Sequence, residues 1–226
     1  NASKPRYIWI DAAANFPDFA NSKENIARDL ALAKDAGFTD IVVDVRPTTG
    51  DVLFKTNLVD QVKFMYAWIG SNYTKVERTA TWDYLQAFVD EARKQGLRIH
   101  AAINTFVGGN QIDGGTGLLY RDQSKAEWAT QMNMQGGITS VMNTSESTKF
   151  FNPAHPEVQT FLCDLLKDLA GYDLDGIFLD RGRFLNLQTD FSDESRKQFE
   201  AYMGGIKIQN YPEDILTPGA SSRSEE

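Results

Sequence analysis

FTDIVVDVRP, residues 38–47, carries the strongest fold signal in this 226-residue chain. Apolar residues continue through the stretch, which is the pattern of a β-strand buried on both faces. Such strands belong to parallel sheets that helices cover, so the stretch predicts an α/β fold. The apolar run stops at two charged residues, Asp44 and Arg46.

The pairing of a strand with a helix recurs on both sides of this stretch. Apolar strands are predicted at 6–12, 39–46, 97–104 and 175–180, and amphipathic helices at 23–37, 81–96, 155–171 and 192–205. Ser22 and Thr81 are the predicted N-caps of the first two helices, and Pro156 lies in the first turn of the third. Strands that alternate with helices predict a parallel sheet.

Two parallel architectures fit this pattern, a doubly wound open sheet and a (β/α)8 barrel. The long segments, 48–80 and 107–155, follow strands, whereas the returns from helix to strand are short. Loops after the strands build the active site of a barrel, so this asymmetry favours the barrel. A complete barrel has eight units. We therefore expect residues 1–205 to form the first four βα units and 206–226 to be a tail leading toward the remainder.

Composition limits the function classes. The net charge of -8 comes without a basic run, so nucleic acid is not expected as a partner. No apolar run has the length of a membrane span. The first ten residues lack the features of a signal peptide, and a mature chain whose export signal has been removed would show the same pattern. Cys163, the single cysteine, is expected to be a small buried apolar residue. With two histidines and no calcium-loop spacing, no metal or other cofactor is predicted.

Polar residues follow each predicted strand at its C-terminal end, where a parallel barrel keeps its chemistry. They are Asp11 on the first strand, Asp44, Arg46 and Asp51 on the second, His100 and Asn104 on the third, and Asp180 and Arg183 on the fourth. Asp11 and Asp44 are equally well read as residues that cap strands, and His100 as a hydrogen-bonded core histidine. A carboxylate at Asp180, beside Arg181 and Arg183, is costly to bury unless it is paired or functional.

Four of these stretches resemble the glycosyl-hydrolase-like 10 family of barrel proteins. DVRPTTGDVLF is similar to the family's second-strand signature through Arg46, Asp51 and Phe54, and HAAINTF to its third strand through His100 and Asn104. FNPAHPEVQTFL matches a segment of Asn-Pro followed by a Pro-led helix, and DGIFLDRGRF matches the fourth strand. The matches follow the family's order and cover about residues 6–204.

The resemblance implies a TIM barrel that acts on carbohydrate. It also implies that a bacterium exports the protein to the periplasm or the cell surface. A lipoprotein whose signal has been removed is one form that such an exported protein takes. The implied activity is that of a glycoside hydrolase on a bacterial or dietary polysaccharide, with peptidoglycan glycan strands as one candidate. Glycoside hydrolysis needs two carboxyl groups. Asp180 is predicted as one. The second is Asp51 or Asp44 within this chain, or a residue of a later strand.

The predicted catalytic residues are therefore Asp180 and Asp51. Contacts with sugar hydroxyl groups are expected from a further set of residues, Arg46, His100, Asn104, Arg183 and Asp44, and ring stacking from Trp9, Phe106 and Tyr120. The alternative is a catalytically inactive barrel that keeps the same residues to bind or scaffold carbohydrate, because one fold hosts many activities.

Overall fold

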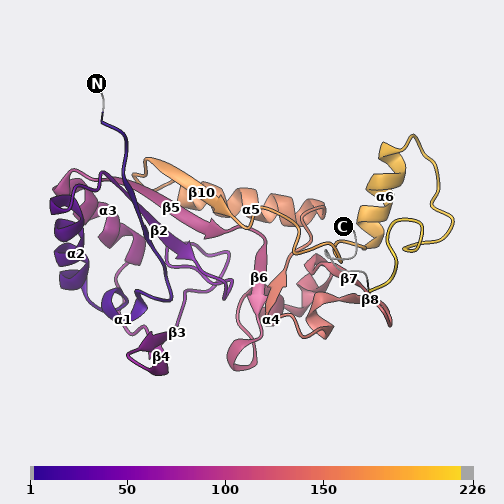
Figure 1. Cartoon of the computed structure of the whole chain (residues 1–226), viewed down its shortest axis with the longest axis horizontal. Helices are drawn as coiled ribbons and strands as arrows, with labels where there is room; N and C mark the ends of the chain where they lie inside the picture. Colours follow the sequence, from indigo (N-terminus) through magenta and orange to yellow (C-terminus); the bar gives the residue numbers. More distant parts are fainter. Residues whose placement is uncertain (1–2, 220–226) are drawn as a thin grey trace. The chain divides into compact units, whose positions relative to one another are not determined.

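The computed structural model describes residues 3–219 of the chain. Its main sheet contains β1 (Tyr7–Ile10), β2 (Asp40–Arg46), β5 (Arg98–Asn104) and β10 (Gly176–Asp180), in the order β1-β2-β5-β10 (Figure 1). Every neighbouring pair in this sheet is parallel. The four predicted strands thus lie side by side in sequence order, which confirms the barrel-type prediction over the doubly wound alternative, whose strand order reverses.

The chain forms two compact units. The first contains residues up to 47, 51–104 and 165–180, and the second contains residues 48–50, 105–164 and those from 181 onward. The main sheet and the helices α1 (Phe16–Phe19), α2 (Lys23–Asp35) and α3 (Tyr84–Gln95) belong to the first unit. All the strand-end residues except Arg183 therefore lie in one unit.

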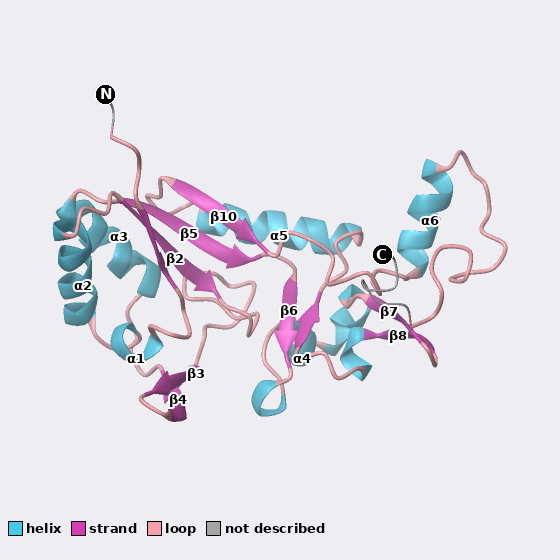
Figure 2. Cartoon of the chain, viewed as in Figure 1, coloured by secondary structure: helices cyan, strands magenta, loops and turns pink. Residues whose placement is uncertain are grey.

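One face of the main sheet is covered by helices. Ile41 and Val43 on β2, with Ile99 and Ala101 on β5, point to this face and are fully buried. α3 packs on β2 and β5, and α2 packs against α3. Figure 2 shows both helices beside the sheet. This burial of alternate aliphatic residues supplies the hydrophobic core of the first unit.

The helix boundaries follow from their capping residues. Ser22 is the N-cap of α2, as predicted, and its hydroxyl accepts a hydrogen bond from the Asn25 backbone N–H at 3.1 Å. The predicted cap of α3, Thr81, is wrong. Asp83 takes that position, and its Oδ1 accepts from the Gln86 N–H at 3.1 Å. The carboxylate of Asp83 forms a charge-assisted hydrogen bond, which is stronger than the bond that the Thr81 hydroxyl would form, so the helix begins at Tyr84.

The opposite face of the main sheet is open over its aromatic residues. Tyr7, Trp9 and Phe178 are 48%, 46% and 40% exposed, respectively. The rings of Tyr7 and Phe178 contact His100, at 5.3 Å and 5.6 Å between ring centroids. In a closed barrel the residues on this face point into the interior.

A hairpin interrupts the long segment after β2. Its strands, β3 (Phe64–Ile69) and β4 (Asn72–Glu77), pair antiparallel and belong to the first unit. The tight turn between them uses Gly70, whose φ of 60° lies in the left-handed region that glycine adopts without strain. Two strands joined by two residues make a β-hairpin.

The second unit contains the whole segment 107–155, which the sequence predicts as a long loop. It holds two antiparallel pairs, β6 (Val107–Asn110) with β9 (Thr148–Phe150) and β7 (Gln131–Met134) with β8 (Gly137–Ser140). It also contains the short helix α4 (Leu118–Arg121), 3-10 helices at Ile112–Gly114, Gln123–Trp128 and Val141–Asn143, and the later helix α6 (Asp193–Tyr202). Strands this short leave little periodicity in the sequence.

The helix α5 (Pro156–Leu169) precedes β10 and opens with Pro156, as predicted. Val158, Leu165 and Leu169 form part of its buried stripe. Cys163 falls outside this stripe and is exposed, so the prediction of a buried cysteine is wrong. Among residues 3–219, the helices all fall short of the length and apolar character needed to cross a bilayer.

Candidate functional site at the strand ends

The C-terminal ends of the main strands bring several predicted site residues to one place. Asp180 is the register partner of Asn104, the last residue of β5. Ile10 pairs with Val43, so Asp11 and Asp44 follow side by side on the neighbouring strands. Alternation along each strand puts these four side chains on the open face, the one that carries Trp9 and Phe178. We call the set of Asp11, Asp44, Asn104 and Asp180 the strand-end site.

Asp44 is the buried member of this site, with 7% of its surface exposed. The Arg46 backbone N–H donates to its Oδ1 at 3.1 Å. Burial raises the pKa of Asp44 to about 7, and the negative charges of Asp11 and Asp180 add to the rise against that hydrogen bond. Asp44 therefore holds its proton close to neutral pH, while two further carboxyl groups lie near enough to influence it.

Arg46 and Asn104 lock the ends of β2 and β5 together. The Arg46 Nη1 donates to the Asn104 carbonyl at 2.5 Å, and the Asn104 Nδ2 donates to the Arg46 carbonyl at 2.9 Å. Arg46 is fully buried, and burial lowers its pKa to about 10 against the opposing charges of Asp51 and Asp44. The structure thus places the charge of Asp51 beside Arg46, and that of Asp44 beside Asp180.

β10 ends abruptly at Asp180 because Arg181 turns the chain. Arg181 has a φ of 47°, in the left-handed region that residues with a side chain seldom adopt. Such a conformation costs about 1–3 kcal/mol and tends to occur at functional sites. The residue in this costly conformation, Arg181, directly follows Asp180, the predicted catalytic carboxylate.

Arg183 lies in the second unit and contacts its own loop. Its Nη1 donates to the carbonyl oxygens of Phe184 and Leu185 at 2.9 and 2.6 Å. The guanidinium also lies over the Phe150 ring, 5.6 Å from its centroid. These contacts order the turn that follows β10, and a sugar contact from Arg183 stays a prediction.

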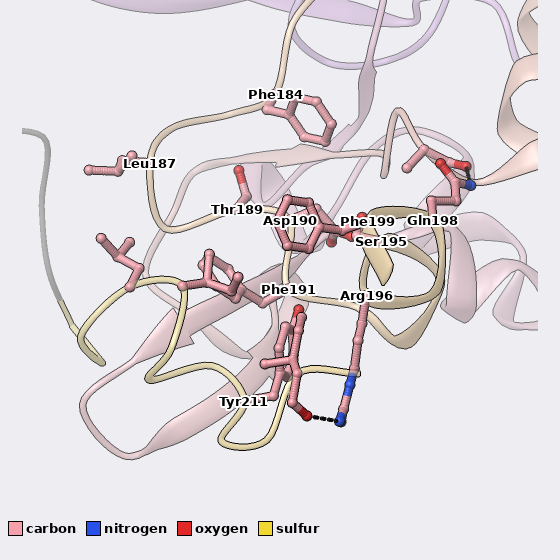
Figure 3. Close-up of a pocket in the computed structure, with 14 residues that line it drawn as sticks. Phe184, Leu187, Thr189, Asp190, Phe191, Ser195, Arg196, Gln198, Phe199 and Tyr211 are labelled. Atoms are coloured by element: carbon pink, nitrogen blue, oxygen red, sulfur yellow. Dashed lines mark hydrogen bonds between the residues drawn. The ribbon is translucent and has the colours of Figure 1, made fainter. Parts of the chain in front are cut away.

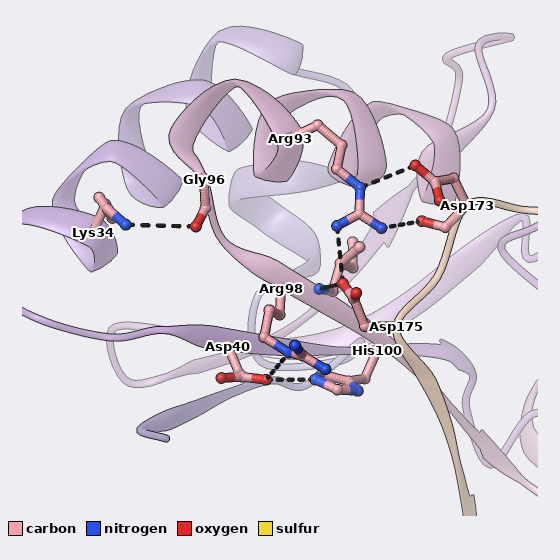
Figure 4. A network of polar contacts seen from close by, with 9 residues as sticks. Lys34, Asp40, Arg93, Gly96, Arg98, His100, Asp173 and Asp175 are labelled. Atoms are coloured by element: carbon pink, nitrogen blue, oxygen red, sulfur yellow. Dashed lines mark hydrogen bonds and ion pairs between the residues drawn. The ribbon is translucent and has the colours of Figure 1, made fainter. Parts of the chain in front are cut away.

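His100 lies four residues before Asn104 on β5, away from the strand ends. Its Nε2 is 2.7 Å from Oδ2 of Asp40, at the start of β2, and Arg98 contacts the same carboxylate at 3.4 Å (Figure 4). Burial acts to raise the pKa of Asp40, but hydrogen bonds from Thr39 and His100 outweigh it and lower that pKa. The structure therefore does not bring His100 together with Asn104 and Asp180, and its position matches the core-histidine interpretation.

The aromatic residues predicted to stack on sugars are divided between the two units. Trp9 lies on the open face of the main sheet, where its ring meets Phe178 edge-on at 6.0 Å. Phe106 and Tyr120 are half-buried in the second unit. Only Trp9 therefore shares a face with the strand-end site.

The sequence predicts no functional role for two residues near this site. Asp11 was recognised as a strand-end residue but was given no role. Tyr84, the first residue of α3, is 1% exposed, and within residues 3–219 its hydroxyl has no hydrogen-bond partner. Burial, followed by the charge of Asp44, raises the pKa of Tyr84. In the sequence Tyr84 is one more large residue at a helix start, so no local pattern distinguishes it.

The second unit contains its own apolar cavity of about 430 Å³ (Figure 3). Phe191, Phe199 and Tyr211 line it together with Arg196, whose Nη2 donates to the Ile208 carbonyl at 3.1 Å. None of the predicted site residues lines this cavity. The cavity is therefore a feature separate from the predicted chemistry.

Four parallel strands in sequence order, with carboxylates at the C-terminal ends of three of them, define part of a (β/α)8 barrel. The family comparison agrees with this fold: the family model described as "Glycosyl hydrolase-like 10" matches residues 4–212. The chain belongs to this family.

Similar proteins support the fold without fixing an activity. An "S-layer-related protein" of Niallia circulans is 30% identical over the whole of this chain, which spans 14% of that protein. Alpha-L-fucosidase isoenzyme 2 from Paenibacillus thiaminolyticus has a TM-score of 0.57 at 18% identity, covering 92% of this chain and 27% of the enzyme. A hypothetical protein from Ruminiclostridium thermocellum has a TM-score of 0.53 at 15% identity, covering 94% of this chain and 100% of its own. Likeness at these identities shows a shared fold.

Proposed function

We propose that this chain is part of a glycoside hydrolase that cleaves O-glycosidic bonds of a polysaccharide, with Asp180 as a catalytic carboxylate. The observation that carries the proposal is the convergence of Asp11, Asp44 and Asp180 at the C-terminal ends of three parallel strands. Barrel enzymes keep their catalytic residues at that end. Membership of a glycosyl hydrolase-like family supports the same reaction class.

The roles follow from the burial of the two carboxyl groups. Glycoside hydrolysis needs one carboxyl group that protonates the leaving oxygen and one carboxylate that attacks the anomeric carbon or activates water. Asp44 holds its proton to about pH 7, which suits the first role. Asp180, exposed at the end of β10, suits the second. Asp51, the other predicted partner, then serves as the negative charge beside Arg46.

The substrate class proposed for the site is a polysaccharide, with peptidoglycan glycan strands as the first candidate. We propose a cell-surface location for the protein, since the relative from Niallia circulans is named as an S-layer-related protein. The proposed domain organisation follows the fold: residues 1–205 supply four βα units, and further strands pair with β1 and β10 to close a barrel.

Replacing Asp180 by Asn tests the catalytic role in a protein that carries this chain together with the remaining barrel. The substitution keeps the size of the side chain but removes its ionisable group. Turnover of the polysaccharide should fall by about 10²–10⁴-fold while glycan binding and melting temperature stay close to those of the unmodified protein. Hydrolysis is measured by release of reducing ends.

Two results would count against the proposal. Full activity in Asp180→Asn would exclude a catalytic role for this carboxylate. Glycan binding without hydrolysis by the unmodified protein would instead support the inactive carbohydrate-binding barrel. Asp35→Asn, which removes an exposed carboxylate at the end of α2, is the matched control and should leave turnover unchanged.

A further inference from the structure

The β3–β4 hairpin gathers aromatic side chains on one of its two faces. Cross-strand pairing joins Trp68 with Tyr73, Tyr66 with Lys75 and Phe64 with Glu77, so these six side chains share a face. We call it the aromatic face. It carries four rings, one cation and one carboxylate, and it has no aliphatic side chain.

The rings of the aromatic face lie against one another and toward solvent. Tyr66 and Tyr73 stack at 5.3 Å with 26° between their planes, and Trp68 lies 5.1 Å from Tyr73. Trp68 is 69% exposed and Tyr73 is 57% exposed. On the other face of the hairpin, Met65 and Ala67 are buried at 6% and 3% exposure. The hairpin therefore anchors itself through one face and leaves its aromatic rings outside the core.

Hydrogen bonds at its base tie the hairpin to the loop that follows β1. The Asn21 Nδ2 donates to the Glu77 carbonyl at 2.9 Å, and the Arg78 Nε donates to the Ala20 carbonyl at 3.0 Å. The hairpin itself belongs to the loop that follows β2. Both loops leave the C-terminal end of the sheet, so the hairpin is rooted at the same end as Asp11 and Asp44.

The chemistry of the aromatic face selects among possible occupants. Stacked rings offer flat apolar surfaces with polar edges, which suit the C–H faces and hydroxyl rims of pyranose rings. An anionic membrane surface would require a cluster of basic residues, whereas this face has only Lys75 and the chain has a net charge of -8. Protein interfaces also use Trp and Tyr side chains, so pairing with a second copy of the chain is the alternative outcome of the test.

We propose that the aromatic face is a glycan-binding surface, which holds successive sugar rings of a polysaccharide outside the strand-end site. The inference rests on the proposed function for the choice of a polysaccharide as ligand. Trp68 and Tyr73 supply the main stacking surfaces because their rings are the most exposed of the four. Glycans that reach the strand-end site then have a second point of attachment at the same end of the sheet.

Affinity electrophoresis of the full chain in gels that contain glycan tests this surface without measuring activity. The probes are peptide-free peptidoglycan strands and, as a neutral polysaccharide, hydroxyethyl cellulose. All proteins carry Asp180→Asn so that the glycan is not consumed. Trp68→Ala and Tyr73→Ala should each weaken retardation by about fivefold or more, as expected for the loss of one aromatic contact.

Three controls separate binding from folding. Tyr202→Ala removes a tyrosine that is 86% exposed on α6 and should leave retardation unchanged. Trp68→Phe keeps a ring and should retain most of the binding. Melting temperatures of Trp68→Ala and Tyr73→Ala should match that of the parent, since both side chains project from the surface.

Retardation that is equal in Trp68→Ala and its parent, or absent with both glycans, would overturn the inference. A concentration-dependent dimer that Trp68→Ala abolishes would assign the face to a second copy of the chain instead. Hydrolysis of the glycan strands by the protein with Asp180 intact is measured separately. Hairpin binding without hydrolysis would contradict only the proposed function, and hydrolysis without hairpin binding would contradict only this inference.

Discussion

Asp44 combines burial with two neighbouring carboxylates, and the pH dependence of folding should show it. Its pKa is about 7 in the folded chain and 3.8 when unperturbed. Both states hold the proton below 3.8, and only the folded state holds it between 3.8 and 7. Stability due to this group is therefore present at low pH and is lost as pH rises through 7.

Replacing Asp44 by Asn should remove this dependence, because the amide keeps the acceptor oxygen but does not ionise. The free energy of unfolding of the parent should fall between pH 4 and pH 8 by up to roughly 4 kcal/mol more than that of Asp44→Asn, at 1.36 kcal/mol per pKa unit. Urea unfolding at the two pH values measures it. Asp35→Asn should behave as the parent does, and equal slopes for Asp44→Asn and its parent would contradict the burial argument.

At the scale of single residues, the sequence identified the type of each strand-end group but not its partners. Asp44, Asn104 and Asp180 stood out because each interrupts or ends an apolar strand. That Asp51 acts beside Arg46, and that His100 turns to Asp40, depends on the register between strands, which one strand's pattern does not contain. Tyr84 did not stand out in the sequence, because the feature that distinguishes it is the burial of its hydroxyl group.

Helix α3 illustrates what decides an element's boundary. Asp83 both caps the helix and accepts a hydrogen bond from the Tyr172 hydroxyl, whereas Thr81 is exposed two residues earlier. Asp83→Ala should therefore destabilise the first unit by about 1–2 kcal/mol. Thr81→Ala, the matched control, should change stability by less than about 0.5 kcal/mol. Urea unfolding followed by circular dichroism compares them, and a larger effect for Thr81→Ala would restore the original prediction.

Among the elements, long periodic segments were predicted well and short ones were not. The four strands of the main sheet and the helices α2, α5 and α6 appear where apolar patterns placed them. The β3–β4 hairpin did leave a readable signal, because aromatic residues occupy every second position from Phe64 to Trp68 and the turn residues Gly70 and Ser71 follow. The pair β6–β9 joins segments that are distant in sequence, whereas β7–β8 is a hairpin of two four-residue strands, which are too short to show a periodic pattern.

For the molecule as a whole, the open face of the main sheet gives the proposed barrel a direct test. Trp9 is 46% exposed on that face, and further barrel strands would enclose it. In a Cys163→Ser background, Trp9→Cys should react with a thiol reagent at least about tenfold more slowly in a protein that carries the remaining barrel than in the chain itself.

Leu32→Cys is the reference for this labelling experiment. Leu32 is 60% exposed on α2, on the outer side of a helix that the barrel does not enclose, and should label equally in both proteins. Equal labelling of Trp9→Cys in both would mean that other strands do not cover the face. The long segments after the strands and the short returns from helix to strand allowed the barrel class to be predicted from the sequence, whereas the division into two compact units depends on contacts across long loops.

The order β1-β2-β5-β10 also affects how the chain behaves in the laboratory. Across the described residues, β1 and β10 each have a strand on one side only, so each presents a row of backbone donors and acceptors along its other side. Such rows recruit strands from other molecules. Concentrated samples of residues 1–226 by themselves would therefore be prone to edge-to-edge aggregation, and co-expression with the further strands of the proposed barrel should favour a soluble, monodisperse preparation.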